Sequence, residues 1–480
     1  SMMEGFGIHS FRMINAEGKS HFVKFHFKPK KGIHSLVWDE AQKVAGKDPD
    51  FNRRDLFESI EAGDFPEWEM GVQVVPEEDE FKFDFDILDP TKIIPEEEVP
   101  VRIFGRLVLN RNTDNYFAET EQVAFHPGHV VPGIDFSNDP LLQGRLFSYI
   151  DTQIKRVGPN FAQLPINRAT CPVHNNQRDG ESQQNVNKGR VSYFPNSLGG
   201  GCPAHSPEAL TAFESYAEKI DGQKVRGRSD SFEENFGQAT LFWNSMAPWE
   251  KEHIAEAFSF ELNMCDVDEV RNRVVNELLV NVHPDLAARV SDQTGVEITA
   301  KGCLGVEKVG DKASPALSMA GQAPKGIKSR KIAIMAGEGC NGAEVDAVKS
   351  ALEAEGAVVE IVAKKAGSVT TAEGKALKVD RAAPNAPPVI YDGVYVPSGG
   401  HVDDLKAFGL ARMFAKEVFA HYKTVAASGN AVSFLEAAGV PTGEPGIVTA
   451  GKGDGKLAKS FIAALAMHKH FDRNIEAVPA

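Results

Sequence analysis

An abrupt change of pattern at residues 300–328 constrains the fold of this chain more than any other feature. Glycine and proline recur through this stretch, which is typical of a flexible linker. After it, residues 331–335 and 358–362 have the pattern of buried strands, and residues 344–356 between them have that of a helix. Two more strand patterns with helices between them follow. This alternation predicts a doubly wound parallel sheet over residues 329–480.

The residues before the linker divide into three parts. Residues 1–150 favour strands, because segments 21–27 and 101–109 alternate between outward and inward side chains. Residues 151–230 are rich in Asn, Gln, Pro and Gly without a period, which is typical of an arm wrapped over another surface. Residues 231–296 carry apolar side chains at helical spacing. The sequence thus predicts a multidomain α+β protein: strand-rich 1–150, wrapping arm 151–230, helical domain 231–296, linker 297–328 and α/β domain 329–480.

Charge and composition exclude several classes of protein. The 480 residues include 52 Lys and Arg against 67 Asp and Glu, so the net charge of −15 disfavours binding to nucleic acids or anionic membranes. No run of about 18 apolar residues predicts a membrane span. The first residues lack the basic and apolar regions of a signal peptide, so the cytoplasm is the default location and the compartment is left open. The five scattered cysteines form no CxxC pair, which favours neither a disulfide framework nor a zinc site.

One segment combines a charged side chain with a possible metal ligand. If a helix starts at Asp139, then Arg145 and Tyr149 lie four residues apart on one face of it. A guanidinium beside a phenol favours the phenolate by its opposite charge, and a phenolate is a hard ligand suited to ferric iron. The spacing alone is equally consistent with a core tyrosine beside a surface arginine.

A second candidate lies nearby. His126 and His129 enclose a Pro-Gly pair, so they lie on a turn and not on one helix face. As a metal pair they are therefore weak, and two turn histidines near the surface are the simpler interpretation.

The wider sequence context bears on these alternatives. The run Arg-Leu-Phe-Ser-Tyr-x-Asp-Thr at residues 145–152 resembles the proximal haem-ligand signature of the haem catalases. The resemblance is nearly continuous over residues 3–290, and tyrosine ligation of haem iron is a general property of catalases. Its other matching segments are residues 3–12, 15–18, 108–112, 115–119, 143–144 and 165–168.

The resemblance implies roles for individual residues. Tyr149 would be the axial ligand of the haem iron and Arg145 its charge partner, while His26 and Asp139 would be the outer links of a hydrogen-bonded relay behind it. Leu141 is expected among the residues that bind the cofactor. From its own surroundings, His26 could equally be a solvent-facing strand histidine on the opposite face from Phe25.

Several features point to the large-subunit branch of the family. Gln153 stands where small-subunit catalases usually have histidine, and in the large-subunit branch the histidine at the position of His126 can be covalently joined to the proximal tyrosine. Large-subunit catalases also carry a flavodoxin-like domain that resembles class I amidotransferases. In this chain Ala427 stands at about the place of the nucleophile, and no histidine is evident near Ser428. This favours a domain that serves stability or assembly.

The same resemblance exposes a difference from the family pattern. In the family, a histidine and an asparagine that act on peroxide precede the segment matching residues 3–12. No histidine precedes His9 and no asparagine precedes Asn15, so the distal residues are expected to be missing from the chain shown. An antiparallel β-barrel, incomplete at its N-terminus, is the expected fold of residues 1–150.

The resemblance implies conversion of hydrogen peroxide to water and oxygen at haem b or an oxidised d-type haem, in a homotetramer. A haem-free scaffold or chaperone-like protein is the competing hypothesis, because the distal groups are absent. An amidotransferase-like hydrolase is a third hypothesis, disfavoured by Ala427.

Overall fold

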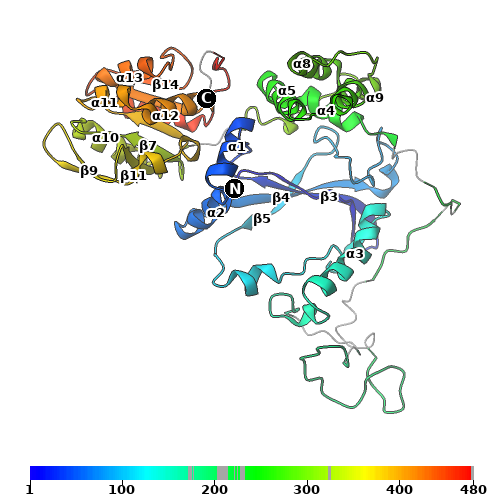
Figure 1. Ribbon diagram of the computed structural model, residues 1–480. Helices are drawn as coiled ribbons and strands as arrows, with labels where there is room; N and C mark the ends of the chain where they lie inside the picture. The colour runs from blue at the N-terminus through cyan, green and yellow to red at the C-terminus, as the bar shows by residue number, and fades with distance from the viewer. Residues whose placement is uncertain are drawn as a thin grey trace.

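The N-terminal segments in which inward and outward side chains alternate form an antiparallel sheet. The computed structural model describes residues 1–170, 176, 178–202, 214–220, 222–223, 225–227, 233–322 and 326–476. The strands pair in the order β5-β4-β3-β2-β6, and β1 also pairs with β3. Their bounds are β1 (Gly5–Phe6), β2 (Phe11–Ile14), β3 (Ser20–Pro29), β4 (Glu67–Pro76), β5 (Arg102–Val108) and β6 (Ile134–Phe136). Figure 1 shows this sheet beside a second, C-terminal body, and the expected mixed α+β composition is confirmed.

The two faces of β3 are used in opposite ways. Phe22, Lys24 and His26 point to one face and are buried, whereas Phe25 and Phe27 on the other face are only half-buried. The buried face is covered by the irregular segment 77–99. Main-chain carbonyls of a covered loop need hydrogen-bond donors, and polar side chains of the sheet can supply them.

Three side chains of the sheet region donate to that segment. Ser10 Oγ lies 2.6 Å from Ile87 O, and Lys24 Nζ lies 2.7 Å from Lys92 O. Gln73 Nε2 donates to two further carbonyls of the segment. The buried polar side chains therefore hold an irregular segment on the sheet.

Helix α3 (Pro140–Arg156) follows β6 directly. The Asp139 carboxylate accepts hydrogen bonds from Leu141 N at 2.9 Å and Leu142 N at 3.0 Å, and Pro140 takes the first helical position. The predicted helix start is thus confirmed. Between α3 and α4 the described residues are mostly turns and irregular backbone, with a short 3-10 helix, η3 (Phe161–Gln163).

Part of that irregular region lies on the chain's own sheet. Tyr216 N donates to Asp135 Oδ2 at 2.5 Å, and Arg12 Nη2 donates to Glu218 Oε1 at 2.6 Å. The Tyr216 hydroxyl donates to Glu77 at 2.7 Å. The predicted wrapping of the whole arm over another surface remains a prediction, and much of the expected arm lies outside the described residues.

Helices follow where helical spacing predicts them. They enclose a core of Trp243, Ala255, Leu279, Leu286 and Val290. Their bounds are α4 (Gly237–Ser245), α5 (Pro248–Asn263), α6 (Asp268–Arg273), η7 (Val274–Leu279), α7 (Val280–Val282) and α8 (Pro284–Thr294). In the described part of the chain, no helix is both long and apolar enough to cross a lipid bilayer.

The segment expected to be a flexible linker is more structured than its composition suggests. It contains helix α9 (Leu304–Val309) and the 3-10 helix η8 (Pro315–Leu317). A Cβ on Gly305 would lie 1.9 Å from Thr240 Oγ1, so glycine here permits α9 to pack directly on α4. Glu250 of α5 accepts hydrogen bonds from Ser318 Oγ and Met319 N at 2.6 and 2.9 Å. Glycine in this segment serves close packing as well as chain flexibility.

The C-terminal region has the predicted alternation of strands and helices. All pairs in its main sheet are parallel, in the order β11-β8-β7-β12-β13-β14. The strands are β7 (Lys331–Met335), β8 (Val358–Ala363), β11 (Arg381–Ala382), β12 (Gly393–Val396), β13 (Thr424–Ser428) and β14 (Ile447–Ala450). Helices α10 (Gly342–Ala354) and α14 (Leu457–Ala466) pack on one face, and α11 (Val402–Ala407), α12 (Gly409–Ala420) and α13 (Val432–Ala437) pack on the other.

Helix α1 (Trp38–Lys47) joins the two bodies (Figure 1). Its Val44 belongs to the apolar core of the C-terminal region. Its buried Glu40 lies between two buried lysines, 2.7 Å from Lys423 Nζ and 2.5 Å from Lys469 Nζ. The N-terminal part therefore contributes one helix to the packing of the C-terminal domain.

Candidate functional site

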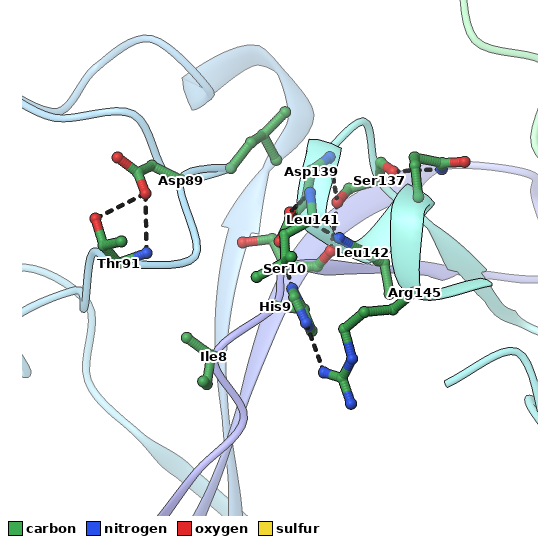
Figure 2. A network of polar contacts seen from close by, with 12 residues as sticks. Ile8, His9, Ser10, Asp89, Thr91, Ser137, Asp139, Leu141, Leu142 and Arg145 are labelled. Carbon is green, nitrogen blue, oxygen red and sulfur yellow. Dashed lines mark hydrogen bonds and ion pairs between the residues drawn. The ribbon is translucent and has the colours of Figure 1, made fainter. Parts of the chain in front are cut away.

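A continuous series of polar contacts leads from Tyr149 into the protein interior. Arg145 Nη2 donates to the Tyr149 hydroxyl oxygen at 2.8 Å, and Arg145 Nη1 lies 2.7 Å from His9 Nε2. His9 Nδ1 lies 2.6 Å from Asp139 Oδ2 (Figure 2). A guanidinium can only donate, so His9 Nε2 accepts, and the ring proton lies on Nδ1, where it is donated to Asp139. We call Tyr149, Arg145, His9 and Asp139 the tyrosine relay.

Helix α3 and the segment between β1 and β2 position the relay. Arg145 and Tyr149 lie one helical turn apart, as their spacing predicts, and the guanidinium carbon lies 4.6 Å from the centre of the tyrosine ring. Asp139 is fully buried and uses both of its oxygens, Oδ1 for the start of the helix and Oδ2 for His9. The same carboxylate therefore begins the helix and ends the relay.

The expectation that His26 belongs to the relay is wrong. Its Nε2 lies 2.8 Å from Gln73 Oε1, on the face of β3 that the segment 77–99 covers. Asp139 meets His9 instead, at the position that the expectation gave to His26. Burial lowers the pKa of His26, so this side chain is neutral at physiological pH.

The only signal in the sequence for His9 was its place in the matching segment 3–12. His26 lies in an alternating strand segment and His9 lies between two short strands, and neither position shows by itself which histidine meets Asp139. The choice depends on which part of the sheet faces helix α3 in three dimensions.

His126 lies next to Tyr149, and its ring is fixed on both sides. The two rings meet edge to face with centres 6.3 Å apart. His126 Nδ1 accepts a hydrogen bond from Gly128 N at 2.8 Å, and Nε2 lies 3.1 Å from Leu146 O. The ring of His129 lies beside it with centres 5.2 Å apart, and burial lowers the pKa of His129. The structure thus brings His126 to the tyrosine, as expected, but does not make a chelating pair with His129.

Large apolar side chains surround the site and face outward. Phe147 of α3 and Phe125 are each 79% exposed, and Leu141 is 52% exposed. A row of aromatic rings also crosses the half-buried face of the sheet, with Phe136, Phe11, Phe25 and Phe104 in successive contact. Exposed apolar surface of this extent marks a place where a ligand or another protein surface binds.

These residues fit a haem group. The Tyr149 oxygen accepts a hydrogen bond from the Arg145 guanidinium, and a tyrosine oxygen is one of the side-chain ligands that haem iron takes in proteins. Leu141 lies two turns before Tyr149 on the same face of α3 and is half exposed, and a porphyrin ring requires apolar contacts of this kind.

A second hydroxyl cluster lies in the C-terminal domain. Ser428 Oγ donates to Glu344 Oε2 at 2.6 Å, accepts from Ser398 N at 3.0 Å and lies 2.9 Å from the Tyr395 hydroxyl. Burial opposes the charge of Glu344, but hydrogen bonds from Ser428, Ser398 N and Gly453 N outweigh it and lower the pKa of the carboxyl. Ser428 is only 1% exposed, and its partners among the described residues include no histidine. The only base that contacts this hydroxyl among the described residues is therefore the Glu344 carboxylate, whose lowered pKa makes it a weak one, and no histidine is placed to activate the serine.

Three family models match successive parts of the chain. The catalase model matches residues 1–200, and a model described as catalase-related immune-responsive matches residues 229–294. A model for the C-terminal domain found in long catalases matches residues 328–475.

The chain is also similar to whole proteins. It is 52% identical over 486 residues to Catalase HPII of Pseudomonas putida, an alignment that covers 100% of this chain and 68% of that protein. It is 51% identical over 473 residues to a catalase of Alkalihalophilus pseudofirmus, covering 98% of this chain and 68% of the relative. Catalase-2 of Bacillus subtilis is 50% identical over 477 residues, an alignment that covers 99% of this chain and 68% of the relative.

Proposed function

The chain belongs to the catalase family, whose members are enzymes that act on hydrogen peroxide, and from this we propose that it acts at a haem iron bound by Tyr149. The proposed reaction converts two molecules of hydrogen peroxide to two of water and one of oxygen. The observation that carries the proposal is the unbroken relay from the Tyr149 oxygen to the buried Asp139.

Each member of the relay has a separate task. Arg145 places its positive charge on the Tyr149 oxygen and stabilises the phenolate. His9 holds the other edge of the guanidinium, and Asp139 fixes the His9 ring and its tautomer. Haem iron, when bound, supplies the redox chemistry that the protein side chains lack.

The surroundings of Tyr149 support haem as the cofactor. Leu141, on the same face of α3 as Tyr149, offers an apolar contact for a porphyrin. We propose that His126 lies beside the ligand and is placed to form a covalent bond with Tyr149, since its ring is already held against the tyrosine. In that step each side chain loses one hydrogen, and one molecule of hydrogen peroxide, the substrate of the proposed reaction, takes up both hydrogens and is reduced to two molecules of water. Haem b and an oxidised d-type haem have different visible spectra, so spectroscopy distinguishes them.

The C-terminal domain has a supporting role in this proposal. Its five longer strands run in the order second, first, third, fourth, fifth, which is the flavodoxin-like order. Ala427 at the end of β13 has no nucleophilic atom, and Ser428 is enclosed by hydrogen bonds. We propose that the domain serves stability and the assembly of a homotetramer, and size-exclusion chromatography with light scattering tests the tetramer.

The visible spectrum and the rate of oxygen release on addition of peroxide test the main proposal. We expect the purified chain to show an intense haem band that Tyr149→Phe removes or strongly weakens. Tyr116→Phe is the matched control, because Tyr116 is 61% exposed and outside the relay. Absence of the band from the unmodified chain grown with a haem supply would overturn the proposal.

A further inference from the structure

Lys24 is a buried cation with no part in the function proposed above. It lies in the middle of β3, opposite Gln73 of β4, and only 4% of it is exposed. Burial of an ammonium group costs free energy unless hydrogen bonds and opposite charges compensate for it. A methionine would fill similar space at lower cost, so the contacts of Lys24 require an explanation.

The Lys24 ammonium connects two segments of main chain. Its Nζ donates to Ile8 O at 3.1 Å and to Lys92 O at 2.7 Å. Ile8 directly precedes His9, and Figure 2 shows the short stretch from Ile8 to Ser10 next to the start of helix α3. Lys24 therefore holds the peptide unit that carries the histidine of the relay.

Three carboxylates compensate the charge of this lysine. Burial lowers the pKa of Lys24 to about 8, and the negative charges of Asp139, Asp89 and Asp86 oppose that effect. Asp139 is itself the end of the relay, and Asp89 also pairs with a second buried cation, Lys92, whose Nζ lies 3.3 Å from Asp89 Oδ2. At neutral pH a positive charge thus lies behind the pair formed by His9 and Asp139.

We propose that Lys24 is a positioning residue for the tyrosine relay: it fixes the main chain that carries His9 through its hydrogen bond to the Ile8 carbonyl. The inference rests on the function proposed above. Misplacing one link of such a series displaces the next, so His9, Arg145 and the Tyr149 oxygen all depend on this contact.

A purely structural role is the alternative, because Lys24 also helps to hold the segment 77–99. Gln73 has that role without touching the relay: it lies opposite Lys24, is fully buried and donates to Ile94 O and Val99 O. Gln73→Met is therefore a matched control for Lys24→Met.

The first measurement is hydrogen exchange of the full chain prepared without haem. We expect Lys24→Met to increase exchange about tenfold in the peptide that covers residues 6–11. Gln73→Met should increase it only in the segment 77–99. If Lys24→Met does not fold, Lys24→Gln removes the charge, keeps one donor and is compared with the control in the same way.

The second measurement uses the haem-loaded chain. Resonance Raman spectra should show a shifted or broadened iron–phenolate band in Lys24→Met and an unchanged band in Gln73→Met, with the ratio kcat/KM reduced about tenfold only in the lysine variant. Equal effects of the two substitutions in both measurements would overturn the inference. A chain that binds no haem would overturn the function proposed for Tyr149, while the exchange measurement would still decide the role of Lys24 at His9.

Discussion

The two sheets of this protein differ in what covers them. In the C-terminal sheet, β7 sends Ile332 and Ile334 into one helical layer and Ala333 and Met335 into the other, so both faces are closed by the chain's own helices. In the N-terminal sheet, one face is closed by an irregular segment and the other presents half-buried and exposed aromatic rings. Parallel sheets are covered on both faces as a rule, whereas an antiparallel sheet can leave one face for another molecule.

The hydroxyl groups of the two regions differ in the same way. Ser428 is buried and its oxygen is enclosed by a carboxylate, a phenol and a main-chain N–H. The Tyr149 oxygen accepts from one cation, and the half-exposed Leu141 lies on the same face of helix α3. A buried hydroxyl whose hydrogen-bonding positions are all occupied stabilises the fold. A hydroxyl that accepts only one hydrogen bond, from a cation, can still bind a metal ion.

The largest effect that we predict concerns the helix that joins the two regions. Glu40→Gln would leave the buried Lys423 and Lys469 without an opposite charge, and breaking a buried ion pair in this way costs about 3–5 kcal/mol. Calorimetry should show the C-terminal domain unfolding separately and at a lower temperature. Lys47→Gln, which changes an exposed lysine in the last turn of the same helix, is the control and should leave a single transition.

The acid dependence of stability sharpens this test. Burial opposes the charge of Glu40, but Lys423 and Lys469 outweigh burial and lower the pKa of Glu40 to about 2. Because the folded pKa is below the ordinary value of 4.5, the stabilisation is complete above that pH and is lost as the pH falls through about 2. The difference in the free energy of unfolding between the native chain and Glu40→Gln should shrink over this window, and a constant difference would contradict the prediction.

The next effect concerns the cation on Tyr149. Arg145→Met removes the donor to the tyrosine oxygen and should lower the rate of oxygen release about 100-fold, with a weaker haem band. Arg156→Met is the control on the same helix, since Arg156 donates to Glu121 O and Val123 O and does not contact Tyr149. A similar loss in both variants would mean that the helix, and not the charge, is responsible.

A smaller effect separates the two buried histidines. His9→Phe should reduce oxygen release about tenfold, because Arg145 loses the ring that orients it. His26→Phe should leave that rate unchanged, although both histidines are 5% exposed and both substitutions remove a buried hydrogen bond. Thermal unfolding of both variants is the control for stability. Loss of activity in His26→Phe alone would contradict the assignment of the relay to His9.

The sequence predicted those parts of the site that are set locally. Asp139 followed by proline predicts the start of α3, and a spacing of four residues predicts that Arg145 and Tyr149 lie on one face. The alternation after residue 330 likewise predicts the parallel sheet. These features follow from helix and strand geometry within a short stretch of chain.

The features that the sequence did not predict depend on contacts between distant segments. His9 is part of the relay because the segment between β1 and β2 meets the start of a helix 130 residues later in the chain. Lys24 and Gln73 are buried because an irregular segment lies over them, which alternation alone does not indicate. Helix α9 depends on the close approach of Gly305 to Thr240. From composition alone, a glycine at this position indicates only a flexible chain.

The smallest predicted effect tests whether the enclosed hydroxyl of Ser428 has any part in catalysis. Ser428→Ala leaves Glu344 and Tyr395 with one hydrogen-bond partner fewer and should cost about 1 kcal/mol of stability. Oxygen release should be unchanged, and a serine-directed fluorophosphonate probe should label the native chain and the variant equally. Ser433→Ala, on the neighbouring helix, is the control, because the hydrogen bond that it removes is exposed and Asn430 O can accept one from water instead. Labelling that depends on Ser428 would show that a buried hydroxyl bound to a carboxylate can react, and the contrast drawn here between the two regions would then fail.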